Sequence, residues 1–180
     1  MKIFSRHNPP DLTGDLATPY TSALFKEILR SGLTLRVKVT GRSMAPFLNG
    51  GEVLTIKQIP VPSLQVGDLI FFTAADNSLL LHRVVRMQRR EKVNIVQTKG
   101  DALRGLDDPV CAENILGKVI SVERCGAGGR KTSLDMESFP RRISNYLIAK
   151  KSLVKSNFFV MIQRCSISPS LRSFVKKTFL

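Results

Sequence analysis

Apolar and polar residues alternate along the middle of the chain, which is the pattern of half-buried β-strands. This alternation predicts strands at residues 33–40, 52–57, 79–86, 92–98 and 115–122, and a strand buried on both faces at 68–73. The segments are short and are separated by turns that contain Gly, Pro or Asp. Short strands at such spacing favour an all-β barrel or coiled sheet. The fold class is therefore predicted to be mainly β.

The hydrophobic period changes to that of a helix on both sides of this region. A short helix is expected to end near Arg30, capped by Thr21 or Ser22 and stopped by Gly32. Its apolar face consists of Leu24, Phe25, Ile28 and Leu29. Residues 139–165 mix apolar side chains with Lys and Arg, which predicts one or two basic amphipathic helices. The expected organisation is an N-terminal arm and helix (1–32), a catalytic β domain (33–125), and a linker with a basic helical tail (126–180).

The formal net charge of +14 is concentrated towards the C-terminal end of the 180 residues. Residues 1–129 contain 17 Lys/Arg and 12 Asp/Glu, a net charge of +5, whereas residues 130–180 contain 11 and 2, a net charge of +9. A basic excess of this size indicates contact with an anionic partner, either phospholipid headgroups or nucleic acid. The helical tail is the part of the chain to which that contact is assigned.

Cysteine and histidine are too few for a metal centre or a disulfide framework. The three cysteines, Cys111, Cys125 and Cys165, show no Cys-x-x-Cys spacing, and an odd count without a framework indicates a reducing compartment. His7 and His82 are the two histidines, which excludes a histidine-rich metal site. We therefore expect neither a metal nor another cofactor.

Nothing in the hydrophobic pattern predicts a membrane-spanning segment or a signal peptide. Such a span needs about 18 consecutive apolar residues, and the longest apolar run near the C-terminal end is residues 158–162. Residues 1–11 have no apolar core of the kind found in signal peptides. The expected location is the cytoplasm, with peripheral contact at a membrane as an open alternative.

Three residues in the β region have the chemistry of an activated hydroxyl nucleophile. Ser43 follows a strand-like run, His82 ends a run of three leucines, and Asp101 follows Lys and Gly. Serine needs a base within hydrogen-bonding reach, and histidine suits that role because its ordinary pKa lies near ~6.5. A carboxylate would hold the imidazole in the correct tautomer. If the three converge in space, the protein is a serine hydrolase, most plausibly a peptidase.

The residues around Ser43 are suited to a rigid, tight turn. Gly41 permits a sharp bend just before the serine. Pro46 fixes its own backbone and restricts the preceding residue, and Met44 completes the Ser-Met-Ala-Pro sequence at 43–46. Gly41, Met44 and Pro46 are accordingly assigned to the turn and the oxyanion region of the expected site.

These segments together resemble the type I signal peptidases, within the larger group that includes the LexA-type self-cleaving repressors. The similarity spans roughly residues 35–122. It comprises Gly-Arg-Ser-Met-Ala-Pro at 41–46, Gly-Gly-Glu-Val-Leu at 50–54, Val-Gly-Asp-Leu-Ile at 66–70, His-Arg-Val-Val at 82–85, Lys-Gly-Asp at 99–101 and Gly-Lys-Val at 117–119. The resemblance implies a coiled β-barrel of the signal-peptidase and LexA kind.

The resemblance also implies roles for the site residues. His82-Arg83 is similar to the family version that uses histidine with an aspartate in place of a lysine base. In that version Ser43 is the nucleophile, His82 the general base and acid, and Asp101 the orienting acid, with Asp107 and Asp108 as rival acids. The oxyanion site would be the Ser43 backbone N–H, alone or with a neighbouring amide, because Gly41 stands where some members have a serine and leaves only backbone donors. Glu52 and Ala102 depart from the family pattern, which usually has Asp and often Asn there.

The predicted function is serine endopeptidase activity on peptide or protein substrates, after small residues such as Ala. An extended substrate would pair with an exposed strand edge, at 33–39 or 79–82. The basic tail would hold the protein at an anionic membrane or a partner, or would instead pack on the barrel as solvated helices. Signal peptidases are anchored by a membrane helix, so the absence of a predicted one argues against secretory signal peptides as the substrate while leaving the chemistry unchanged.

Two other functions remain open. A self-cleaving regulator would use the same nucleophile, with Ser31-Gly32 as the nearest candidate bond and DNA as the anionic partner. The lysine base of that class is absent here, and the region before Ser43 has room for one helix, which makes nucleic acid the less favoured partner. A catalytically silent binding module of the same fold is the third hypothesis.

Overall fold

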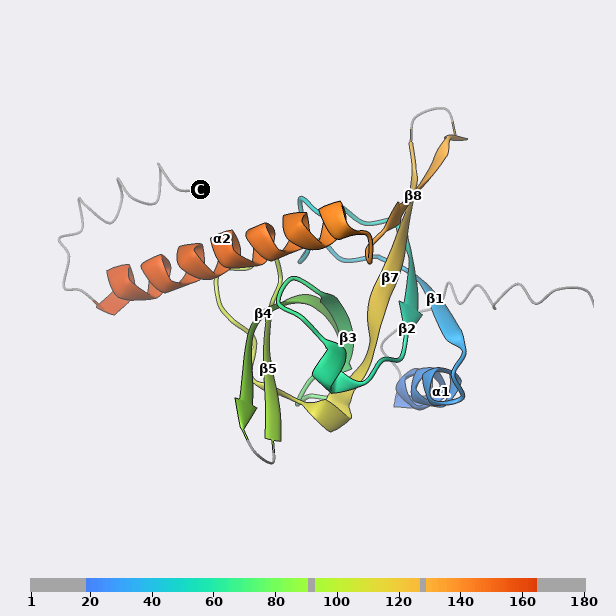
Figure 1. Ribbon diagram of the computed structural model, residues 1–180, viewed down its shortest axis with the longest axis horizontal. Coiled ribbons are helices and arrows are strands. Elements are labelled where there is room, and N and C mark those ends of the chain that lie inside the picture. The colour runs from blue at the N-terminus through green and yellow to red at the C-terminus, as the bar shows by residue number, and fades with distance from the viewer. Residues whose placement is uncertain (1–18, 91–92, 127–128, 165–180) are drawn as a thin grey trace, which may run out of the picture.

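The computed structural model describes residues 19–90, 93–126 and 129–164, and shows an antiparallel sheet with one helix before it and one after it (Figure 1). In this part of the chain eight strands join in the order β1-β2-β7-β3-β4-β5-β6, and β8 pairs with β7 outside that path. The strands are β1 (Thr34–Lys38), β2 (Val53–Lys57), β3 (Leu69–Thr73), β4 (Leu79–Arg90), β5 (Val93–Lys99), β6 (Val110–Cys111), β7 (Ile115–Cys125) and β8 (Lys131–Asp135). The helices are α1 (Pro19–Arg30) and α2 (Phe139–Arg164), and short 3-10 turns lie at Val61–Ser63 and Ala112–Asn114.

The sheet is open, so the prediction of a barrel is wrong although the prediction of a mainly β protein is confirmed. β1 pairs with β2, and β6 pairs with β5, but these two ends of the sheet do not pair with each other. A barrel closes only when its first and last strands form a ladder. The periodicity of single strands does not carry information on that long-range pairing.

Strand β7 holds the two halves of the sheet together. It pairs with β2 and with β3, and each pairing contains a register shift, at Thr55/Ile56 and at Phe71/Phe72. Gly117 lies at this crossing, where a Cβ atom would stand 2.7 Å from the carbonyl oxygen of Lys57. A side chain at residue 117 would therefore push β2 and β7 apart.

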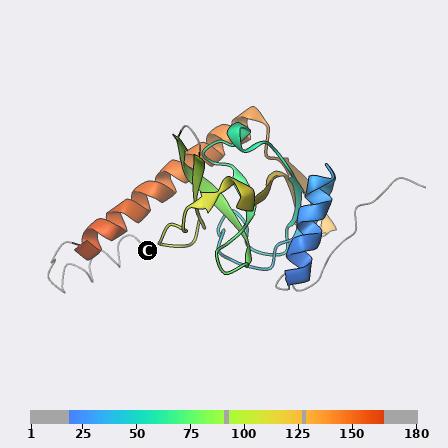
Figure 2. The same cartoon turned by 90° about the horizontal axis from the view of Figure 1, so that it is seen from below.

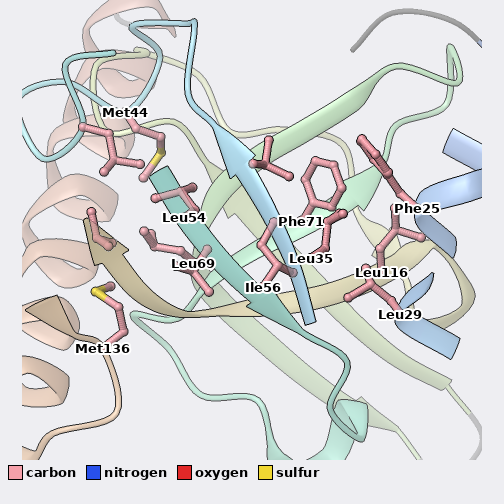
Figure 3. Close-up of a cluster of buried hydrophobic side chains, with 14 residues drawn as sticks. Phe25, Leu29, Leu35, Met44, Leu54, Ile56, Leu69, Phe71, Leu116 and Met136 are labelled. Atoms are coloured by element: carbon pink, nitrogen blue, oxygen red, sulfur yellow. The ribbon is translucent and has the colours of Figure 1, made fainter. Parts of the chain in front are cut away.

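The larger of two hydrophobic clusters connects α1 to the region of the expected nucleophile (Figure 3). Phe25 and Leu29 of α1 lie at one end of this cluster, and Met44 and Met136 lie at the other. The second cluster lies among β3, β4, β5 and β7 and includes Ile70, Phe72, Val84 and Val96. The two clusters hold both flanks of β3 and β4, the strands that present the expected base.

The tail region differs in part from its predicted organisation. Two strands, β6 and β8, do not appear in the pattern of the sequence, and β8 lies within the range 126–180 that was expected to be a linker and helices. The side chains of β8 are mostly exposed, so the strand has little apolar alternation to reveal it. Residues 139–164 form one continuous helix, α2. The predicted arm and the last residues of the tail lie largely outside the described residues.

The two helices lie on different sides of the sheet in both views (Figures 1 and 2). α1 packs beside β1, whereas α2 runs past β4. Neither helix, over the stretches that the structure describes, has the length and apolar character needed to cross a bilayer.

Candidate active site

Ser43 lies in the loop between β1 and β2, and buried neighbours hold that loop in place. Met44 is 2% exposed and belongs to the larger hydrophobic cluster, as does the fully buried Leu48. The Leu48 N–H donates to the Met44 carbonyl at 2.9 Å, and the Ala45 N–H donates to the Arg42 carbonyl at 3.0 Å. The peptide bond before Pro46 is cis. Ser43 itself is half-buried, so its hydroxyl lies at the surface of a well-packed turn.

Glu52 closes the other end of the same loop. Its carboxylate accepts hydrogen bonds from the N–H groups of Asn49 at 2.9 Å and Gly50 at 2.8 Å. Gly50 and Gly51 both have positive φ, at 95° and 93°, which glycine adopts without strain. Glu52 is longer than the aspartate expected from the resemblance, and in this chain its oxygen atoms reach both amides.

His82 lies on β4 and points its ring towards Ser43. The distance between His82 Nε2 and Ser43 Oγ is 3.1 Å, within hydrogen-bonding range. His82 is 3% exposed, stands opposite Ile70 of β3, and meets the edge of the Phe72 ring at a centroid distance of 6.3 Å. Burial and these neighbours limit the rotation of the imidazole, which keeps Nε2 aimed at the serine.

Asp107 is the carboxylate that contacts His82. The Asp107 Oδ2 atom lies 2.7 Å from His82 Nδ1 and accepts a second hydrogen bond from Thr98 Oγ1, also at 2.7 Å. The Asp107 N–H donates to the Thr98 carbonyl at 3.0 Å, which returns the loop after β5 to the end of that strand. The sequence indicated Asp107 only as an alternative to Asp101 for the orienting acid, and it indicated no role for Thr98.

The electrostatics of Asp107 determine the tautomer of His82. Burial acts to raise the pKa of Asp107, but the hydrogen bonds from His82 and Thr98 outweigh it, and the pKa is lowered from its ordinary value. An ionised carboxylate only accepts hydrogen bonds. His82 Nδ1 must therefore carry the proton, which leaves Nε2 as the acceptor for the Ser43 hydroxyl.

Asp101, the favoured acid in the sequence, is placed elsewhere: it pairs with Arg83. Arg83 Nε lies 2.9 Å from Asp101 Oδ1, and an Arg83 terminal nitrogen lies 2.7 Å from Asp101 Oδ2. Arg83 is fully buried, donates to the Gly67 carbonyl at 3.0 Å, and has its guanidinium carbon 4.8 Å from the centre of the Phe47 ring. Neighbouring side chains of a strand point to opposite faces, so His82 and Arg83 take different carboxylates. Asp108, the other rival acid, is exposed.

The Lys-Gly-Asp segment positions Ser43 through its backbone. The Ala102 N–H donates to the Ser43 carbonyl at 2.9 Å. A Cβ atom on Gly100 would lie 2.7 Å from that same carbonyl oxygen and 2.9 Å from the Leu103 side chain. Glycine at position 100 therefore permits the close approach of two loops that carry parts of the site.

The expected oxyanion region lies on the open side of the serine loop. Gly41 and Pro46 are exposed, and the Ser43 N–H donates to no acceptor within the described ranges. Across the same residues no group of three or more His, Cys, Asp or Glu side chains is arranged to hold a metal ion. The arrangement is thus a partly buried carboxylate, a buried imidazole and a half-buried hydroxyl in series, next to a backbone N–H for which no acceptor is seen among the described residues.

A comparison with curated proteins found a partial similarity in sequence. The chain is 36% identical over 86 residues to signal peptidase I W of Bacillus subtilis (strain 168). The match covers 47% of this chain and 45% of that protein, so the chain spans about half the length of the curated relative it matches. This similarity supports a signal peptidase I-like relationship. No family model matches the chain, and no solved structure matches it.

Proposed function

We propose that the chain is a serine endopeptidase in which Ser43, His82 and Asp107 form the catalytic triad. The observation that carries the proposal is the continuous hydrogen-bonded series Ser43 Oγ, His82 Nε2, His82 Nδ1 and Asp107 Oδ2. A signal peptidase I-like relationship implies a serine peptidase, in agreement with this chemistry. Asp107 replaces Asp101 in the assignment because it is the carboxylate within reach of the imidazole.

The proposed reaction begins with proton transfer from the Ser43 hydroxyl to His82 Nε2 as the oxygen attacks the scissile carbonyl. The oxyanion that forms is stabilised by the Ser43 N–H, an interaction of a kind whose loss costs about 10²–10³ in rate elsewhere. His82 then donates its proton to the leaving amine. Water, deprotonated by the same nitrogen, hydrolyses the acyl-enzyme. Asp107 remains ionised throughout and stabilises the imidazolium.

The substrate in this proposal is an extended peptide with small residues before the scissile bond, as in the processing of signal or leader peptides. The open edges of the sheet support the extended geometry. Residues 79–82 of β4 pair with β3 on one side, and the pairing of β4 with β5 begins only at Arg83. A peptide that continued the sheet along this edge would pass beside the His82 backbone.

The experiment that tests the function is cleavage of an Ala-x-Ala peptide library, read by mass spectrometry. Ser43→Ala and His82→Ala are expected to lose cleavage, because each removes one end of the proton transfer. Ser133→Ala, at an exposed position of β8, is the matched control and should cleave like the wild type. Full activity in Ser43→Ala would refute the proposal. A cut between Ser31 and Gly32 in the intact mass spectrum would instead favour the self-cleaving alternative.

A further inference from the structure

Helix α2 contacts the rest of the protein through small and polar side chains. Its buried residues are Asn145, Ala149, Ser152 and Ser156, whose spacing of four, three and four residues places them on one face. The Ser152 hydroxyl accepts a hydrogen bond from the buried Lys99 ammonium at 2.8 Å. A Cβ atom on Gly67 would lie 2.7 Å from the backbone nitrogen of Tyr146, so the helix backbone approaches the sheet closely. The inward face therefore needs no large apolar residue.

The opposite face of α2 carries large apolar residues in solvent. The exposed fractions are 77% for Phe139, 47% for Ile143, 60% for Leu147 and 68% for Val154. Their spacing of four, four and seven residues aligns them along the helix, away from the buried row. A helix at the surface of a water-soluble domain normally buries such a stripe and exposes its polar side. In α2 the two sides are reversed.

The cations of α2 lie beside this apolar stripe and are not balanced by acids. Arg142, Lys150, Lys151 and Lys155 are exposed, and the sequence from 139 to 164 contains no Asp or Glu. An apolar stripe flanked by Lys and Arg is the composition of helices that lie in the interface of an anionic bilayer. The apolar stripe alone, or the cations alone, would not distinguish a membrane from a protein partner. The two features together favour anionic lipid.

We propose that the outer face of α2, defined by Phe139, Ile143, Leu147, Val154 and the adjoining cations, docks on an anionic phospholipid surface. Binding to the lipid surface does not depend on catalysis. Its role rests on the proposed function and is to hold the site near a membrane-bound substrate. A second copy of the chain is a poorer occupant, because two α2 faces would bring like charges together. The segment 165–180 has the same drawback, because it contains Arg172, Lys176 and Lys177 and no acid.

The inward face of α2 is linked to the loop that carries Ser43. Lys99, which holds Ser152, also donates to the carbonyl of Gly100 at 3.2 Å, and Gly100 abuts the Ser43 carbonyl. α2 and the serine loop are thus linked through two residues of the Lys-Gly-Asp segment. Docking of the outer face would therefore also fix the position of the serine loop relative to the bilayer.

The test uses the full chain with Ser43→Ala, so that its outcome is independent of activity. The sequence has no tryptophan, so a Leu147→Trp variant has a single tryptophan, and it lies on the proposed face. Its emission should shift to the blue with vesicles that contain phosphatidylglycerol and not with phosphatidylcholine alone. The matched reporter is Leu24→Trp on α1, where Leu24 is 48% exposed, and its emission should not change.

Charge reversal tests the electrostatic part of the proposal. Lys150→Glu with Lys151→Glu should weaken binding to anionic vesicles by about 30-fold or more, given about 1 kcal/mol for each lysine near the surface. Lys26→Glu with Arg30→Glu makes the same change in net charge on α1 and should have a much smaller effect. Binding should also weaken as salt rises from about 0.1 M to about 1 M, where the Debye length falls from about 10 Å to about 3 Å.

Three results would overturn the docking proposal. One is an unshifted Leu147→Trp spectrum with anionic vesicles. Another is an emission spectrum that is already blue-shifted before vesicles are added. If a second copy of the chain covers the face, that shift depends on protein concentration. If residues 165–180 cover it, the shift is independent of concentration. The third is equal weakening by the charge reversals on α1 and α2. Each is distinguishable from failure of the proposed peptidase function, which is measured on peptides without lipid.

Discussion

At the residue scale, two aspartates of one loop bind different side chains. Asp107 contacts the imidazole of His82, whereas Asp101 neutralises the fully buried Arg83. We predict that Asp107→Asn lowers kcat by roughly 10²–10⁴, because an amide in place of the carboxylate no longer selects the Nδ1–H tautomer; the same change in a well-studied triad costs about 10⁴. The measurement is peptide cleavage, with circular dichroism to show that the variant is folded.

Asp101→Asn should lower the stability of the protein and leave the chemistry of the triad unchanged. Removing one partner of a buried ion pair costs about 3–5 kcal/mol, because the remaining charge has lost its compensation. We therefore expect a lower urea midpoint for this variant, while the folded fraction keeps the pH profile of the wild type. A stable Asp101→Asn protein with an altered pH profile would show that Asp101, as the sequence first indicated, takes part in catalysis.

The lowered pKa of Asp107 predicts the pH dependence of activity and stability. The folded pKa lies below the ordinary value of 3.8, so the carboxylate stabilises the fold fully above that value and loses its contribution as the pH falls through the folded pKa. Asp107 should therefore stay ionised throughout the neutral range and add no ionisation of its own to the kcat/KM profile there. An ionisation of the Asp107 carboxylate between pH about 5 and 8 would contradict this assignment.

At the scale of elements, α2 is held to the sheet by a hydrogen bond from a buried charge. Burial lowers the pKa of Lys99 below its usual 10.5, although Asp101 and Asp107 act to raise it. Because the unfolded chain binds this proton more tightly, the contribution of Lys99 to stability increases as the pH rises from the folded pKa towards 10.5. The Ser152 hydroxyl partly offsets the cost of burying the ammonium at neutral pH.

Ser152→Ala should consequently destabilise the protein by about 1.5–3 kcal/mol, the usual value of a hydrogen bond to a charged group. Urea denaturation measures the change, and Ser133→Ala on β8 should stay within about 0.5 kcal/mol of the wild type. A Ser152→Ala protein as stable as the control would mean that the Lys99 contact contributes nothing to the docking of α2.

At the scale of the whole molecule, the open sheet leaves edges where a substrate strand can add. The β4 edge at residues 79–82 includes His82, whereas β1 is the outer strand at one end of the sheet. We predict that N-methylation of one substrate amide next to the scissile bond reduces kcat/KM by up to about tenfold, because one backbone hydrogen bond is lost. Methylation beyond the paired segment is the control. Equal effects at all positions would contradict recognition by strand addition.

The strands and the chemistry-bearing residues follow from local patterns. Alternation along 79–86 predicts β4, because it depends on neighbours in sequence, whereas the convergence of Ser43 and His82 was expected from the resemblance to the signal peptidases. Thr98 directly precedes the Lys-Gly-Asp segment and Arg83 directly follows His82, yet their partners cannot be inferred from position. A buried arginine beside a histidine in an apolar strand was nevertheless a usable indication that a second carboxylate was required.

Local pattern by itself determined a mainly β chain with helices at both ends, a serine in a tight turn and a histidine on a strand. Tertiary structure decided that Asp107 meets His82, that the sheet stays open, and that α2 turns its apolar stripe outward. These outcomes depend on the path of the loop after β5, which brings Asp107 back to the end of that strand. They also depend on which strands pair, and which face of α2 packs on the sheet, between segments far apart in sequence. Hydrophobic periodicity specifies that a residue is buried, whereas its partner depends on the packing of segments far apart in sequence.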